Sequence, residues 1–407
     1  MILAGQLLLP SPPDRCRLAT GIVRIEEGVI AEVVEGPLPS RFDLGGEGCL
    51  IAPGFIDAHV HLPQFDIIGG HGMPLLEWLN EVTFPAERRW EDVEFATSMT
   101  KRVLDQCLRN GTTAICAYAT VHYRSVDAAL KIARDRGMRG VIGHVLMDRE
   151  APSYLCREPS ESIEQSAELL HRFPSTARMA AAVTPRFAIS CTSELLTLAG
   201  NLAAEHQAIV QTHLAETLAE CEYVLNLFEN KRYVDVYREA GLLTTKTILG
   251  HGIFLDPSDR EKISDSGALI AHCPTANSFL RSGTMYREQW LRDGVKVAIG
   301  SDIGAGYERS MVRVARAMIE AAATLSIGFP TAAEAWYAIT AGNASLLGWD
   351  DAGKLQVGAP ADLVLIEPDI AWQNGHIDSL AMLMFAWDDR WIKQVMLRGV
   401  KQLAIVD

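Results

Sequence analysis

The sequence lacks the cysteine pairs that mark disulfide-rich domains and many zinc sites. Its 407 residues contain 8 cysteines, which are scattered and form no C-x-x-C pair. In a chain of this length, such cysteines are typical of a reduced, cytoplasmic protein. The elements H-x-E and P-C-x-x-C, which hold zinc in compact nucleobase deaminases, are also missing. The sequence therefore argues against a disulfide framework and excludes that class of zinc site.

An excess of positive charge is also missing. The chain has 37 lysines and arginines against 51 aspartates and glutamates, which gives a net charge of −14 at pH 7. Such a charge repels phosphate backbones and anionic lipid surfaces, so neither nucleic acid nor a membrane is expected as a partner. Residues 1–10 are apolar, but they are too short to span a bilayer and lack the features of a signal peptide. We expect them to form a first strand.

The composition is that of an ordinary globular protein, with 48% hydrophobic and 22% charged residues. Short apolar runs separated by turn residues fill residues 1–52. Similar apolar runs occur at residues 361–366, 391–397 and 402–406. These runs predict the strands of one small β domain built from both termini, residues 1–52 plus 353–407. Residues 53–352 are then left as one continuous domain.

Apolar strand-like runs alternate with helical patterns in this larger domain, which predicts parallel β/α units. Eight strands are expected, at residues 55–61, 113–118, 140–146, 179–184, 208–213, 247–251, 268–272 and 295–300. Helices are expected at residues 91–110, 126–136, 162–173, 192–205 and 311–325, with Ser162 and Thr192 as N-cap candidates. A glycine-rich excursion at residues 67–84 is expected to cover the barrel mouth. The strand count and the length predict a (β/α)8 TIM barrel.

The first of these strands ends in two histidines, His59 and His61. Residues two apart on a strand face the same side, so both imidazoles can reach one metal ion. In a parallel barrel the carboxyl ends of the strands form the active-site end. A lone His-x-His pair would fit core histidines bonded to the backbone equally well. The rest of the chain decides between these interpretations.

Three other strands end in side chains that bind metals or transfer protons, namely His213, His251 and Asp302. Taken singly, each could be a structural capping residue. Together with the first strand they place imidazoles and a carboxylate at one end of the barrel. This donor set suits Zn²⁺ or Fe²⁺ with room for a water molecule. Two further histidines near strand ends stay ambiguous, His122 and His272.

These motifs, in this order, resemble the amidohydrolase superfamily. The segment PGFIDAHVH at residues 53–61, followed by the three strand-end residues, is similar to its metal-binding pattern. Further segments resemble the members that deaminate guanine: LLEWL at 75–79, TFPAE at 83–87, NGTT at 110–113, VTPRF at 183–187, HLAE at 213–216 and AHCP at 271–274. The resemblance implies a distorted (β/α)8 TIM barrel with a small β-sandwich domain built from both termini.

The resemblance also assigns roles to individual residues. It implies one Zn²⁺ per chain, with Fe²⁺ as an alternative, held by His59, His61, His213 and Asp302. Strand four carries no lysine, so a second metal bridged by a carbamylated lysine is not expected. The implied catalytic residues are the proton shuttle Glu216, the water-orienting His251 and the proton acceptor Asp302. Four residues would bind the substrate: Gln64, Arg186, Phe187 and Trp78.

The newly assigned residues also have structural interpretations. Arg186 could form an ion pair at the barrel mouth, Gln64 could belong to a turn, and Phe187 could lie in the core. Glu216 could be a carboxylate favoured by the dipole at a helix N-terminus. Its position three residues after His213 favours the proton shuttle.

The activity implied by the resemblance is the zinc-dependent hydrolytic deamination of guanine to xanthine and ammonia, a step of purine catabolism or salvage. Deamination of a pterin, of 8-oxoguanine or of another aminopurine by the same site stays open. A metal-free binding or scaffold protein is a second alternative, but it should have lost metal ligands, and none is missing. A small purine base is the expected partner, and a cytoplasmic homodimer is the expected assembly.

Overall fold

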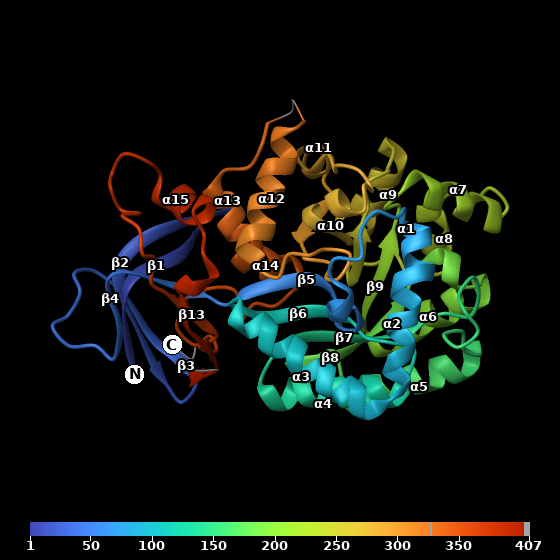
Figure 1. Cartoon of the computed structure of the whole chain (residues 1–407), viewed down its shortest axis with the longest axis horizontal. Helices are drawn as coiled ribbons and strands as arrows, with labels where there is room; N and C mark the ends of the chain where they lie inside the picture. Colours follow the sequence, from blue (N-terminus) through green and yellow to red (C-terminus); the bar gives the residue numbers. More distant parts are fainter. Residues whose placement is uncertain (326–327, 403–407) are drawn as a thin grey trace.

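The computed structural model of the chain describes residues 1–325 and 328–402. Its strands form two sheets, one of eight and one of seven strands. Figure 1 shows the smaller sheet at one side of the molecule, with both ends of the chain, and the larger sheet surrounded by helices. This architecture confirms the predicted (β/α)8 barrel with a small β domain built from both termini. Within the described ranges, no helix is long and apolar enough to cross a membrane.

The larger sheet is a nearly closed barrel of parallel strands that follow one another in chain order. All eight predicted strands are present. They are β5 (Phe55–His61), β6 (Thr112–Tyr118), β7 (Arg139–Leu146), β8 (Met179–Pro185), β9 (Ile209–Leu214), β10 (Thr247–His251), β11 (Leu269–His272) and β12 (Lys296–Ile299). Most of these strands are buried along their whole length, because helices cover the outside of the barrel.

The five predicted helices are α3 (Val93–Arg109), α4 (Tyr123–Arg136), α5 (Pro159–Arg172), α6 (Ser193–His206) and α12 (Met311–Ala323). Thr192 caps α6 as predicted, because its side chain accepts the N–H of Leu195. The prediction of Ser162 as a cap was wrong. The cap of α5 is Glu158, whose carboxylate accepts the N–H of Glu161, and Ser162 lies buried inside the helix.

Shorter helices complete the barrel and its mouth. They are α1 (Leu75–Trp78), α2 (Phe84–Arg88), α7 (Leu218–Leu227), α8 (Tyr233–Glu239), α9 (Pro257–Ser266), α10 (Pro274–Phe279), α11 (Arg287–Arg292), α13 (Ala332–Tyr337), α14 (Asn343–Leu346) and α15 (Ser379–Phe385). The helix α1 belongs to the glycine-rich excursion after β5, and α2 begins at the last residue of this excursion, Phe84. This segment contributes Leu75, Trp78 and Leu79 to the wall of a cavity at the barrel mouth, which confirms its predicted covering position.

The smaller sheet joins residues from both ends of the chain. It contains β1 (Ile2–Ser11), β2 (Arg15–Glu26), β3 (Val29–Glu35), β4 (Leu44–Pro53), β13 (Leu363–Ile366), β14 (Ile392–Leu397) and β15 (Val400–Lys401). The link between the ends is the antiparallel pairing of β13 with β4. One pairing of this sheet is parallel, that of β1 with β4, and the others are antiparallel. The predicted strand at 402–406 lies outside the described residues from 403 onwards, and the division of domains at residues 52/53 and 352/353 stays a prediction.

Contacts outside the regular strand ladder close the barrel between β12 and β5. The backbone N–H of Asp302 donates to the carbonyl of His59 at 2.8 Å. Lower in the same seam, the buried amide of Asn343 accepts the N–H of Ile299 at 2.9 Å and donates to the carbonyls of Ile56 and Ile299 at 2.8 Å. The seam therefore fixes the register of the two segments that carry three of the four candidate metal ligands.

Candidate active site

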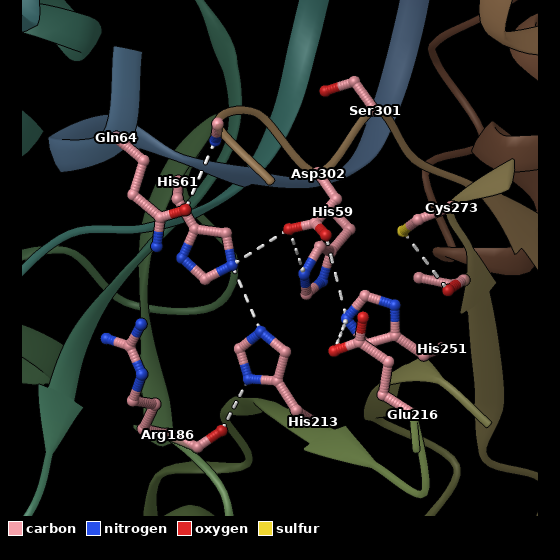
Figure 2. Close-up of polar contacts among 12 residues, drawn as sticks. His59, His61, Gln64, Arg186, His213, Glu216, His251, Cys273, Ser301 and Asp302 are labelled. Atoms are coloured by element: carbon pink, nitrogen blue, oxygen red, sulfur yellow. Dashed lines mark hydrogen bonds and ion pairs between the residues drawn. The ribbon is translucent and has the colours of Figure 1, made fainter. Parts of the chain in front are cut away.

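Three histidines and one aspartate meet at the carboxyl ends of the barrel strands (Figure 2). His59 and His61 come from β5, His213 from β9, and Asp302 follows β12. One ligand atom from each residue lies within 4.8 Å of the others. The Nε2 atoms of His61 and His213 are 3.1 Å apart, and Asp302 Oδ1 is 3.3 Å from Nε2 of both His59 and His61. The four side chains therefore face one common point.

The spacing and the donor types fit one tetrahedral metal ion. Ligand atoms placed tetrahedrally at ~2.0–2.1 Å from Zn²⁺ lie about 3.3 Å from one another. Both ring nitrogens of His59 are buried without a hydrogen-bond partner in the described residues, as expected for an imidazole that binds a metal ion. A Cβ atom at Gly300 would approach the Cβ atom of His59 to 2.6 Å. Glycine at this position therefore leaves the room that the ligand needs.

A hydrogen bond to the protein orients His213, and one aromatic ring packs against all three imidazoles. The Nδ1–H of His213 donates to the carbonyl of Arg186 at 2.7 Å, which leaves Nε2 free to bind a metal (Figure 2). The ring of Tyr118 packs against the three histidine ligands, with ring centroids 4.6 to 4.9 Å apart. Burial lowers the pKa of His61 to about 3. The imidazole is therefore neutral at physiological pH, as a metal ligand must be.

A fourth histidine and a glutamate complete the polar wall. His251 Nδ1 lies 2.9 Å from Oδ1 of Asn277, and its Nε2 faces Oε2 of Glu216 at 3.3 Å and Oδ2 of Asp302 at 3.8 Å. The hydroxyl of Ser282 donates to Oε1 of Glu216 at 2.6 Å. Burial opposes a charge on His251, but the carboxylates of Glu216 and Asp302 raise its pKa above the ordinary value. Glu216 and His251, two of the three catalytic candidates, are therefore in direct polar contact.

Hydrogen-bond donors gather on the opposite side of the metal ligands (Figure 2). The guanidinium of Arg186 is 4% exposed and forms an ion pair with Glu87, in which Nη1 lies 2.7 Å from both carboxylate oxygens. The amide of Gln64 donates from Nε2 to Oε1 of Glu87 at 3.3 Å. Trp78 and Phe187 add apolar surface to the same cavity. The cavity therefore joins the metal ligands to a wall of donors and aromatic rings.

The chain is similar to known proteins of one family in both sequence and fold. The model of the Amidohydrolase family matches residues 50–401. The guanine deaminase of Escherichia coli (strain K12) is 38% identical over 365 residues, which cover 86% of this chain and 82% of that enzyme. The chain belongs to the amidohydrolase family. Its fold is similar to the E. coli guanine deaminase structure, with a TM-score of 0.93, 34% identity and 100% of both chains covered. It is also similar to the guanine deaminase of C. acetobutylicum with bound guanine in the active site, with a TM-score of 0.90, 28% identity and 99% of both chains covered.

This amidohydrolase brings all the residues predicted for the site to one place. The four predicted metal ligands form the cluster, and the predicted catalytic and substrate-binding residues Gln64, Trp78, Arg186, Phe187, Glu216 and His251 line the adjoining cavity. Their individual roles stay predictions. Strand β8 carries no lysine, and the cluster fits a mononuclear site. The two histidines that the sequence left ambiguous, His122 and His272, do not belong to the cluster.

Sequence reasoning missed several residues that support the site. Glu87 lies in the TFPAE segment, which the sequence flagged as a motif without giving this residue a role. Tyr118 is the last residue of its strand, where functional side chains are expected in a barrel. Asn277 follows the AHCP segment closely, and its position there was the only signal for it. Ser282 lies in the segment after α10, and nothing in the local sequence marks its contact with Glu216.

Replacing Glu216 with glutamine is expected to stabilise the metal-free protein at alkaline pH. Burial raises the pKa of Glu216 to about 7 from 4.5. Between these two values the unfolded chain has released the proton while the folded chain retains it, so stability falls as pH rises. The cost is complete above pH ~7 and amounts to about 3 kcal/mol, at ~1.4 kcal/mol for each unit of pKa. Urea unfolding of the metal-free proteins should show this gain for Glu216→Gln at pH 8 and no gain at pH 4. Equal free energies of unfolding for the wild type and Glu216→Gln at both pH values would contradict the raised pKa.

Proposed function

We propose that this chain is a zinc-dependent hydrolase that converts guanine and water to xanthine and ammonia. The observation that carries the proposal is the composition of one cavity. It joins a three-histidine, one-aspartate cluster to a buried carboxylate and to the donors of Arg186 and Gln64. A planar base that fits this cavity would present its amino-bearing carbon to the metal ligands and its carbonyl edge to the donors. The likeness to guanine deaminases over most of the chain supports the same assignment.

His59, His61, His213 and Asp302 would hold the Zn²⁺ ion. When bound, such an ion lowers the pKa of a coordinated water from 15.7 to about 7 and so supplies a nucleophile at neutral pH. Asp302 accepts a proton from the attacking water. His251 donates a hydrogen bond to the oxygen on which charge develops. Its Nε2 lies beside the metal ligands, 3.8 Å from Oδ2 of Asp302.

Glu216 carries the proton from the water to the base. It passes one proton of the water to the ring nitrogen beside the attacked carbon C2. It then relays the second water proton, which Asp302 accepts, to the departing amine, which leaves as ammonia. Its raised pKa of about 7, caused by burial, suits a group that must both accept and donate a proton near neutral pH. The hydrogen bond from Ser282 fixes one carboxylate oxygen, so the other faces the reacting atoms.

The test is an ammonia-release assay with the metal-loaded enzyme on guanine, 8-oxoguanine and a simple pterin. A pterin and 8-oxoguanine carry the same carbonyl and amine arrangement as guanine, so the donor wall alone does not separate them. We expect the highest kcat/KM for guanine. A preference of tenfold or more for either of the other two bases would overturn the guanine assignment and leave the deaminase chemistry in place.

Elemental analysis of the purified protein is expected to find about one Zn²⁺ per chain, because the cluster offers four ligands to one ion. His213→Ala removes a ligand and should weaken zinc binding by more than about 100-fold in a chelator competition. Glu216→Gln changes a neighbour that is not a ligand and should retain the metal. Two metal ions per chain would contradict the mononuclear site, and iron in place of zinc would change only the identity of the ion.

The proposal extends to the cell compartment and the assembly. All eight cysteines are free, as expected of an enzyme of the reducing cytoplasm. Barrels of this superfamily often dimerise, so we propose a homodimer. Light scattering of the purified enzyme tests the assembly, and a monomer mass at micromolar concentration would contradict it.

A further inference from the structure

We infer that Glu87 sets the base specificity of this site by positioning Arg186 and Gln64. The inference rests on the proposed function in taking a purine with a 6-carbonyl group as the ligand. Glu87 itself does not line the cavity, and its side chain is 1% exposed. It lies on α2, directly after the segment that covers the barrel mouth, whereas Arg186 follows β8 and Gln64 follows β5. One buried carboxylate therefore joins two substrate-binding candidates from separate parts of the chain.

The geometry of the ion pair leaves part of the guanidinium available. Both oxygens of Glu87 converge on Nη1 of Arg186, and no other hydrogen bond of this guanidinium is found in the described residues. Arginine has five N–H donors in a planar fork, so the N–H groups of Nη2 and Nε stay free for a ligand. The ring of Phe84, whose centroid is 5.3 Å from the guanidinium carbon, restrains the plane from the side.

The same carboxylate fixes which way the Gln64 amide points. Glu87 accepts a hydrogen bond from Nε2 of Gln64, so Nε2 and not the oxygen faces the carboxylate. The oxygen of Gln64 is then engaged by the backbone N–H of Gly304 at 3.3 Å. What stays free on this amide is a donor, the second N–H of Nε2.

The result is a wall that offers donors only. A carbonyl oxygen at position 6 of a purine accepts such hydrogen bonds, whereas the C–H group of unsubstituted purine and the amino group of adenine at that position cannot. Removal of the Glu87 charge would free Nη1, release the Gln64 amide to rotate and let the wall offer an acceptor. A carboxylate that only neutralised Arg186 would need no contact with Gln64, and this second contact is what points to specificity.

The experiment compares equilibrium binding of hypoxanthine, which has the 6-carbonyl group but no 2-amino group, with that of unsubstituted purine. In Glu87→Gln the dissociation constant for hypoxanthine should rise by about 30-fold or more, because buried donors lose their alignment. The constant for purine should stay within about threefold, and zinc content should be unchanged. In an Arg186→Gln background, which has lost the fork, adding Glu87→Gln should change the ratio of the two constants by less than it does in the wild type, because only the contact with Gln64 is left to lose. The control Asp362→Asn removes a buried carboxylate from its ion pair with Arg178, remote from the cavity, and should leave the ratio unchanged.

An equal rise of both constants in Glu87→Gln would overturn the inference, because a merely structural role weakens all ligands alike. A ratio that stays within about threefold of the wild-type value would overturn it as well. If Glu87→Gln does not fold, Glu87→Asp is measured by the same criteria, since its carboxylate is one methylene further from the guanidinium. Failure of the proposed function is a separate result, in which the wild-type enzyme releases no ammonia from guanine.

Discussion

Glu216→Gln is expected to lower the turnover of guanine by a factor of ~10² or more while the protein stays folded and keeps its metal. Glutamine keeps the size of the side chain and can still accept the hydrogen bond from Ser282. It cannot accept or release a proton at neutral pH, so the transfer from water to the base loses its carrier. Steady-state kinetics should show the loss in kcat, with elemental analysis as the check on the metal. Retention of most of the activity would show that Glu216 is a structural carboxylate.

Glu220 provides a matched control for this variant. It is a second buried carboxylate in the lining of the same cavity and lies on α7, but its oxygens are engaged by the hydroxyl of Tyr233 at 2.6 Å and the backbone N–H of Glu216 at 2.8 Å. It belongs to the capping box of α7. Glu220→Gln should therefore cost less than about tenfold in kcat. A loss as large as that of Glu216→Gln would mean that the kinetic effect reflects the shape of the loop and not proton transfer.

The barrel and the metal cluster were predictable because their signals are local. Each barrel strand is a short apolar run, and the ligands stand at the ends of such runs, where the parallel topology brings them together. His59 and His61 share one strand face, and Asp302 follows the last strand, so their convergence needs only the strand order. Local signals also mislead. The start of α5 was placed too late, because Ser162 is a good cap residue while the actual cap, Glu158, is a poorer one.

The supporting contacts were not predictable because they join residues that are far apart in the sequence. Glu87 and Arg186 are separated by 99 positions, and Asn343 and Ile56 by 287. The sequence around either residue of such a pair does not indicate which residue is its partner. The partners become visible only when packing has set the distance between segments, as in the short contact between Ser282 and Glu216. The candidate metal ligands and cavity residues were therefore easier to find in the sequence than the residues that hold them in place.

The enzyme is expected to deaminate guanine with a kcat/KM at least ~10⁴ times that for adenine or cytosine. The reason is the cost of unpaired donors. Guanine presents a carbonyl oxygen to Arg186 and Gln64, whereas adenine presents an amino group, which would leave buried N–H groups of both residues without a partner. Selection by size alone would give only ~10- to 200-fold, so the ratio distinguishes the two mechanisms.

Two variants show whether this discrimination depends on the planar fork of Arg186. In Arg186→Ala the kcat/KM for guanine should fall steeply while zinc stays bound, since the side chain holds no metal. Arg186→Lys keeps a charge beside Glu87 but presents an ammonium group in place of a fork, so it should rescue little of the activity. Initial rates of ammonia release, measured for guanine and adenine on all three proteins, give the ratio directly. Full activity of Arg186→Lys on guanine would show that a positive charge is sufficient. A wild-type ratio of kcat/KM for guanine over adenine below ~200 would show that the site selects bases by size and not by its donors.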